Sequence, residues 1–237
     1  MLSDFPRRPV LQKGALAVYE SDKPGTQPKV IVFQFNPEQL KRSLANRAPQ
    51  NPPSNTGGAK EDVLRVGGPP VENINLTVAL NAVDQPAGVT GLNERQGASQ
   101  DGLHPALATL EMLLYPTTLW IQHNQQLAKG GAVQITSERL PLVLLIWGKS
   151  RVVPVTLTSF SISEEAFDTT LNPIQAKVEL GLRVLTYMEL KEDKLGRDTY
   201  LAYQRQKETF ARSYSAGDKV KEVTGFDQKT YTRPGAG

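Results

Sequence analysis

Histidine, the side chain that most readily carries protons near neutral pH, occurs only twice in this chain of 237 residues. His104 precedes Pro105 at the start of an expected helix, which favours a role at the helix terminus. His123 lies among amides in WIQHNQQ, which favours an exposed position or a polar contact. Neither histidine has a carboxylate cluster beside it in the sequence, so the pair makes a poor metal site.

The carboxylates of SEEAFD, residues 163–168, could in principle bind a cation or take part in acid–base chemistry. Glu164, Glu165 and Asp168 are better interpreted as solvated charges at a turn that ends a strand. The glycine pairs lie outside any strand–GxxxxGK[ST]–helix context, and no G-x-S-x-G turn occurs. The absence of cysteine excludes a thiol nucleophile, thiolate zinc sites and iron–sulfur clusters. We therefore expect no enzyme activity, no bound metal and no cofactor.

Charge and hydropathy exclude two further classes. The formal net charge is only +3, and it is dispersed along the chain. Lys41, Arg42 and Arg47 have only Phe35 near them, so they favour a solvated or subunit-contacting edge over a nucleic-acid site. No apolar run approaches 18 residues and the N-terminus has no signal-peptide pattern, so we expect neither a nucleic-acid partner nor direct membrane insertion.

Hydrophobic periodicity predicts the elements that must carry any site. Residues 71–84 alternate apolar and polar side chains, which is typical of a strand with one wet face. Residues 140–148 form a continuous apolar run, which predicts a strand buried on both faces. The predicted strands cover 14–21, 30–36, 71–84, 140–148, 151–168 and 173–190. The predicted helices cover 104–116, 118–131 and 196–217, the last capped by Asp198 or Thr199.

This order of elements predicts a mainly β fold. Strands, a helical interlude and three adjacent strands favour an antiparallel β-barrel or sandwich with one central helix and a C-terminal helical extension. We expect an N-terminal arm over 1–13, a β domain over 14–190 with a long loop at 44–71, and a C-terminal helix and tail over 191–237.

Aromatic side chains recur along the last predicted helix at helical spacing. They are Tyr200, Tyr203, Phe210 and Tyr214. Such a stripe either covers the chain's own β domain or contacts a partner protein, and the spacing leaves both open.

One segment carries a family resemblance. FQFNPEQLKRS resembles the signature of the tube-type baseplate proteins of contractile injection systems. The matching residues are Phe33, Phe35, Asn36, Pro37, Leu40, Arg42 and Ser43. Further segments follow in the same order, namely GGPPVENINLTVALNAVD, LHPALATLEMLL, LPLVLLIWG and TLTSFSISEEAFDTTLNPIQAKVELGLRV. The resemblance covers roughly residues 14–190.

The resemblance implies a phage tail-tube fold and a homo-hexameric ring. It implies a structural role at the baseplate, where the ring joins the spike protein to the inner tube and starts tube assembly beside other baseplate proteins. Relatives often add a C-terminal LysM module, and residues 191–237 are too short for one. Assembly would occur in the cytoplasm, within a phage-tail-like particle; release from the cell and docking at a membrane or thylakoid through other components are both left open.

The same resemblance, taken with the polar strand faces, suggests which residues meet which surroundings. The expected ring contacts are Phe35, Asn36, Pro37, Lys41, Arg42 and Arg47. The expected lumen-facing residues are Asn73, Asn75, Thr77, Lys177, Glu179 and Arg183. The expected partner-docking residues are Tyr200, Tyr203, Phe210 and Tyr214.

After Asn36-Pro37 we expect PEQLKRS to leave the barrel and lead into the long loop, which would reach a neighbouring subunit or the next ring. Two alternatives remain: a cap at the other end of the same tube, and a glycan-binding β-sandwich. For the latter, Trp120, Trp147 and the tyrosines are the only candidate contacts.

Overall fold

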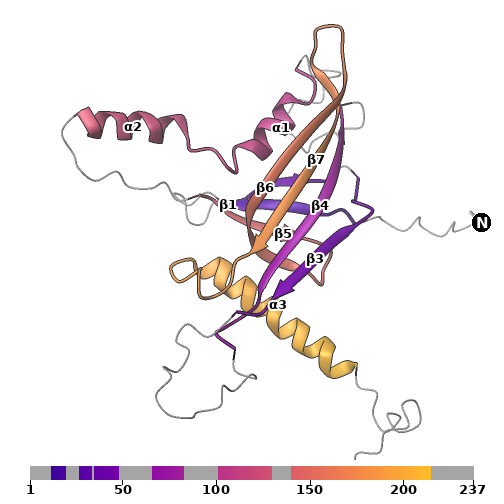
Figure 1. Ribbon diagram of the computed structural model, residues 1–237, viewed down its shortest axis with the longest axis vertical. Helices are drawn as coiled ribbons and strands as arrows, with labels where there is room; N and C mark the ends of the chain where they lie inside the picture. Colours follow the sequence, from indigo (N-terminus) through magenta and orange to yellow (C-terminus); the bar gives the residue numbers. More distant parts are fainter. Residues whose placement is uncertain are drawn as a thin grey trace, which may run out of the picture.

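The computed structural model describes residues 12–19, 27–33, 35–47, 66–82, 101–129 and 140–214. Seven strands and three helices lie in these ranges (Figure 1). The strands are β1 (Ala15–Tyr19), β2 (Lys29–Val32), β3 (Leu40–Ala45), β4 (Val71–Asn81), β5 (Leu142–Ile146), β6 (Val152–Phe167) and β7 (Pro173–Val184). The helices are α1 (His104–Glu111), α2 (Thr118–Lys129) and α3 (Lys194–Ser213).

The described strands form one antiparallel sheet in the order β2-β1-β5-β6-β7-β4-β3. The fold is therefore mainly β, as predicted. The sheet is not closed, because β2 and β3 lie at its two edges and do not pair with each other. The predicted barrel or sandwich is therefore corrected to one open sheet of the described strands.

Asn36 explains why the ladder stops at one edge. Its side-chain oxygen accepts a hydrogen bond from the Gly14 amide at 2.9 Å, and its side-chain nitrogen donates to the Gln12 carbonyl at 2.8 Å. The side chain thus takes over the pairing with the segment before β1 once strand β2 has ended. Pro37, which has no amide hydrogen, follows, and the chain crosses to the other edge through residues 37–39.

The segment after Asn36-Pro37 does not leave the sheet, which is a second correction. Residues 40–45 form β3 and pair with β4 from Leu40 opposite Leu76 to Ala45 opposite Val71. Of the predicted loop 44–71, residues 44–45 therefore belong to a strand. The Gly67 amide donates to the Arg47 carbonyl at 2.9 Å, which joins the two sides of the connection. Residues 48–65 lie outside the described ranges, so the reach of this loop stays a prediction.

One face of the sheet carries the main core, and a helix covers each end of it (Figure 1). Leucines from and around α1 enter the core at one end, and Tyr200 and Tyr203 of α3 enter it at the other. Strand β5 is buried on both faces, as predicted. Val143 and Leu145 lie in the main core, while Leu142 and Leu144 pack with Leu190 in a second cluster. In α1, Pro105 occupies the first turn as expected.

Helix α3 begins earlier than predicted. Asp193 caps it by accepting a hydrogen bond from the Gly196 amide at 2.8 Å, whereas Thr199 lies inside the helix and donates to the Leu195 carbonyl. The predicted strand 173–190 likewise ends at Val184. A turn follows, in which Glu189 accepts from the Thr186 amide and hydroxyl at 3.1 and 3.2 Å.

Strands β6 and β7 form a long hairpin, and its turn is organised by Asp168. The carboxylate accepts hydrogen bonds from the Thr170 amide and hydroxyl and from the Asn172 amide and side chain, at 2.8 to 3.0 Å. Leu171 takes a left-handed backbone within this turn. The predicted acidic group is thus divided, since Glu164 and Glu165 lie in strand β6 and only Asp168 is in the turn.

Hydrogen bonds from Asn172 and then Thr170 lower the pKa of Asp168 from 3.8 to about 2. The ionised form therefore supports the turn fully above pH 3.8, and this support is lost as the pH falls through about 2. We expect a carbon NMR titration of the Asp168 carboxyl to have its midpoint near 2, and N172A to move it toward 3.8. A midpoint near 3.8 in the unaltered chain would contradict this arrangement.

Candidate assembly interface

The six predicted lumen residues lie together on one face of the sheet. Asn73 is opposite Arg183 and Thr77 is opposite Glu179, while Asn75 is opposite Gly181 and Lys177 is opposite Ala79. Strict alternation puts Ile74, Leu76, Val78 and Leu80 of β4 on the other face, in the core. One side of strands β4 and β7 is therefore polar and the other apolar.

Strand β6 extends this polar face with serines. Ser161 is opposite Glu179, Ser163 is opposite Lys177, and Ser159 is opposite Gly181. A shift in register between Leu157 and Ser159 brings the Ser159 hydroxyl over Gly181, and a Cβ on that glycine would lie only 2.1 Å from it. Gly181 thus permits the close approach of two strands where the β6 ladder is irregular.

Lys177 and Arg183 on this polar side are joined into ion pairs. Lys177 contacts Glu165 of the neighbouring strand at 2.6 Å. Arg183 is paired with Glu189 of the turn after β7. Burial tends to raise the pKa of Glu189, but hydrogen bonds from Arg183 and Thr186 outweigh it and lower the pKa. We refer below to Asn73, Asn75, Thr77, Lys177, Glu179, Arg183 and the three serines of β6 as the polar face.

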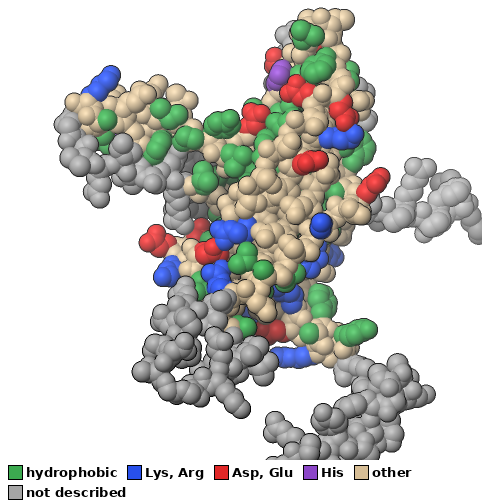
Figure 2. All heavy atoms as spheres, in the orientation of Figure 1, with side chains coloured by type: hydrophobic (Ala, Val, Ile, Leu, Met, Phe, Trp, Pro, Cys, Tyr) green, Lys and Arg blue, Asp and Glu red, His purple; other side chains and the backbone are tan. Residues whose placement is uncertain are grey.

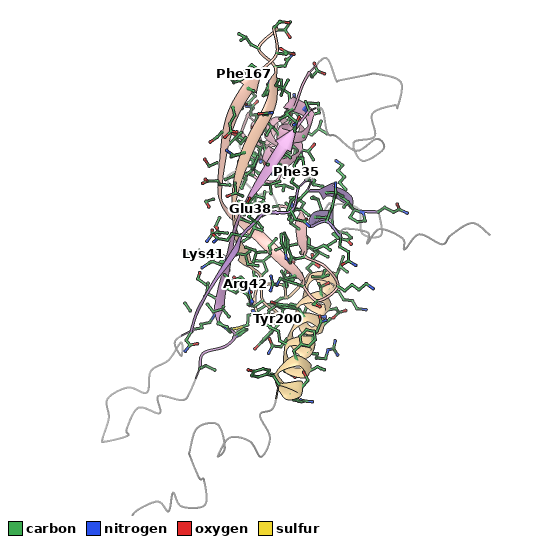
Figure 3. All side chains as sticks on the ribbon, turned by 90° about the vertical axis from the view of Figure 1, so that its right-hand side faces the viewer. Phe35, Glu38, Lys41, Arg42, Phe167 and Tyr200 are labelled. Carbon is green, nitrogen blue, oxygen red and sulfur yellow. The ribbon has the colours of Figure 1, made fainter. Side chains whose placement is uncertain are left out.

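The six residues predicted as ring contacts are not one cluster, and Figure 3 shows Phe35 apart from Lys41 and Arg42. Phe35 is 48% exposed, whereas Asn36 is bonded to the segment before β1. Lys41 is opposite Asn75 on the polar face side of β3. Pro37 and Arg47 are half-buried, and Arg47 donates to the Pro69 carbonyl at 3.4 Å.

Arg42 lies on the core side of β3 and takes part in a buried ion cluster. Glu72 is only 4% exposed, and its carboxylate contacts Arg42 at 2.6 Å and Lys207 of α3 at 3.8 Å. Arg42 also donates to the Tyr203 hydroxyl at 3.3 Å, and the Lys207 ammonium lies 4.3 Å from the centre of the Tyr203 ring. We call these four residues the Glu72 cluster. It ties an edge strand, its neighbour and the C-terminal helix together.

The Glu72 cluster was missed by the sequence analysis. The sequence nevertheless contained a signal for it. Glu72 is two positions from Ile74, and Arg42 is two positions from both Leu40 and Leu44. Both charges therefore fall on the apolar side of their strands. Opposite charges at such positions are expected to pair rather than to face water. The contact between Arg42 and Glu72 also supports the pairing of LKRSLA, which contains two basic residues, with strand β4.

The stripe of four aromatic residues on α3 is divided by burial. Tyr200 and Tyr203 are buried in the chain's own core, and Tyr200 also lies 6.1 Å from the Tyr187 ring. Burial, with the nearby Glu72 charge, raises the pKa of Tyr200. Phe210 and Tyr214 are 52% and 92% exposed. The partner contact predicted for all four can therefore apply only to Phe210 and Tyr214, for which it stays a prediction.

The two histidines and the acidic residues of the described ranges do not gather into a metal site. His104 is exposed at the start of α1 and His123 is exposed on α2. Within the ranges that the structure describes, no three histidine or acidic side chains come together as metal ligands, and no helix has the length and apolar character needed to cross a bilayer. Trp120 and Trp147 are half-buried, on α2 and at the end of β5.

No protein-family model matches the sequence, and no curated protein matches it. Among solved structures, the chain is similar to the tail of an empty gene transfer agent particle refined with C6 symmetry. The identity is 12%, the alignment covers 72% of this chain and 90% of that one, and the TM-score is 0.28. The virion of a native gene transfer agent particle aligns over 72% and 90% of the chains at 11% identity and a TM-score of 0.26. Likeness at this level does not establish a shared fold.

The Glu72 cluster predicts unequal costs for its two cations. R42M removes the close partner of a buried carboxylate and the bond to Tyr203, so we expect it to lower the free energy of unfolding by about 3 kcal/mol. K207M should cost less than about 1 kcal/mol, because its pair is longer and half-exposed, and because burial already lowers the pKa of Lys207 despite Glu72. Denaturant unfolding followed by tryptophan fluorescence measures both, with K41M as an exposed control. Equal costs for the two variants would show that Arg42 is not the dominant partner of Glu72.

Proposed function

We propose that the chain is a structural, non-enzymatic subunit of a contractile injection system. In this proposal it forms a hexameric ring at the baseplate, joins the spike to the inner tube and initiates tube assembly. The observation that carries the proposal is the polar face, on which residues from β4, β6 and β7 present amides, hydroxyls and charged groups to solvent. The family resemblance of residues 14–190 supports the same reading.

A ring that surrounds a passage needs this division of the sheet. The wall facing the passage must be wetted and must not hold its contents strongly, which neutral polar groups and paired charges provide. The other face must hold the subunit together, and here it carries the main core. Two unpaired sheet edges suit the same role, because exposed edges are a liability that assembly can cover.

In the assembled particle we propose further partners at the ends of the ring. The spike protein and the inner tube subunits would contact opposite ends, and other baseplate proteins would contact the outside. Assembly in the cytoplasm needs no nucleic acid and no insertion of this chain into a membrane. The unit from 14 to 190 would form the ring, and the segment from 191 would serve attachment.

The absence of cysteine in the chain allows a direct test of the passage. In isolated subunits, T77C on the polar face should react with both a small maleimide and a maleimide carrying a large polymer, because Thr77 is exposed. In purified rings it should react with the small reagent only, since the large one cannot enter. E208C, on the exposed side of α3, is the matched control and should react with both reagents in both states.

Light scattering and negative-stain images of the same samples report whether rings form when the spike and tube proteins are present. A chain that remains a monomer and never enters particles would refute the proposed function. Rings in which T77C reacts equally with both reagents would remove the polar face from the passage.

The exposed half of the α3 stripe generates a separate expectation. F210A combined with Y214A should leave the subunit folded, because both side chains lie outside the core. It should nevertheless reduce incorporation into particles, if these residues contact a baseplate partner. Particle content can be measured by quantitative immunoblotting against a tube protein. R205A with R212A, on the same helix, is the control. Deleting the whole helix would be a poor test, since Tyr200 and Tyr203 fill the core.

A further inference from the structure

Helix α2 and the turn before it carry a dense group of exposed apolar side chains. None of the residues of α2 is buried. Between residues 112 and 127 the exposed large hydrophobic residues are Met112, Leu114, Tyr115, Leu119, Ile121 and Leu127. Figure 2 shows hydrophobic side chains gathered on α2 and on the adjoining part of the body. We call these six residues the α2 patch.

The position of α2 makes its exposure unusual. The helix stands off to the left of the body in Figure 1, away from the sheet and from α3. It has only twelve residues, and an isolated helix of that length is marginal in water. Its ends give limited support: the Thr117 hydroxyl accepts from the Trp120 amide at 3.3 Å and Lys129 lies in the last turn, but the first turn holds no acidic residue. A stable α2 therefore needs a surface that covers its apolar side chains.

A second exposed apolar group lies on the opposite side of the same chain. Phe35 faces the viewer in Figure 3, which is the right-hand side of Figure 1, while α2 extends from the left-hand side. Phe35 is 48% exposed, and Val30 of the edge strand β2 is also exposed. Strand β2 is short and forms the end of the sheet, and covering an edge with a helix is one way in which proteins protect it. We call Val30, which lies in β2, and Phe35, which follows the strand, the β2 patch.

Two different patches on opposite sides of one chain fit a head-to-tail contact between copies. Such a heterologous contact repeats from subunit to subunit, and it closes into a ring when the rotation permits. The α2 patch contains no charged side chain, so it can be buried without the cost of desolvating a charge. A two-fold contact would bring the α2 patch of each copy to the β2 patch of the other within one shared interface, which patches on opposite sides of the chain disfavour.

We propose that α2 of one subunit packs on the β2 patch of a second copy of this chain, and that this contact links neighbours around the ring. The proposal rests on the proposed function for ring closure, but the contact itself does not require it. It assigns α2 to the contact between subunits. Phe35, one of the residues expected at ring contacts, packs in this proposal against α2 of the neighbouring copy.

The test uses introduced cysteines, since the chain has none of its own. L119C in a chain lengthened by a tag is mixed with F35C in an untagged chain, and a flexible bifunctional maleimide is added. We expect one crosslinked product whose mass is the sum of the two chains. A single chain carrying both L119C and F35C should give a ladder of multiples. F35C mixed with E208C is the matched control and should give no product above background.

A second measurement does not depend on crosslinking. L119D combined with L127D should weaken association by more than about tenfold, because charges would enter the covered surface. Q125D, on the same helix, should leave association unchanged. Circular dichroism of the variant subunits checks that the sheet remains folded.

Light scattering on the same samples separates this contact from the proposed function. Rings that form without the L119C–F35C product overturn the contact and leave the ring proposal standing. Crosslinked open chains support the contact and contradict the ring. Chains that stay monomeric and give no product overturn both.

Discussion

A single buried carboxylate governs how the sheet and the C-terminal helix are fixed together. Glu72 lies on the apolar face of β4, where a lone charge would be costly. Arg42 and Lys207 meet that charge, one from the edge strand β3 and one from α3. Because β3 and α3 both contribute to this ion cluster, the position of each depends on the other. Tyr203 joins the two cations through its hydroxyl and its ring, and thereby extends the cluster into the core.

The sheet can expose a polar face only because its other face is well covered. The core receives side chains from both ends, through the leucines of α1 and the tyrosines of α3, so an open sheet needs no closing strand pair to exclude water. Asn36 completes the arrangement at the β2 edge by bonding to Gly14 and Gln12 in place of a strand. The polar face is composed mainly of short polar side chains. Its two basic residues, Lys177 and Arg183, are each paired with a carboxylate.

The sequence predicted the parts of this fold that local patterns determine. Alternation identified β4 and β7, a continuous apolar run identified β5, and Pro105 marked the start of α1. Strand β3 was missed because LKRSLA has three polar residues in a row. The partner of its Arg42 is Glu72, which lies thirty positions away in the sequence. The same alternation that placed Asn73, Asn75 and Thr77 correctly on one face contained the clue to Glu72. The cap at Asp193 is a local contact to the Gly196 amide that the choice of Asp198 or Thr199 overlooked, whereas the division of the aromatic stripe depends on tertiary contacts that spacing alone does not show.

Helix α3 packs against the chain's own sheet along its first half, whereas the aromatic side chains of its second half are exposed. Gly196, Tyr200, Tyr203, Lys207, Phe210 and Tyr214 follow one another every three or four residues, so they form one continuous seam. The first half of the seam meets the chain's own sheet, and the Glu72 cluster lies where that contact ends. Beyond Lys207 the seam continues with Phe210 and Tyr214, which no described part of the chain buries. The aromatic spacing therefore continues past the part of α3 that contacts the sheet, and this favours a second contact surface at Phe210 and Tyr214. The ion cluster anchors the helix where its contact with the sheet ends, and the outer half of the seam is exposed.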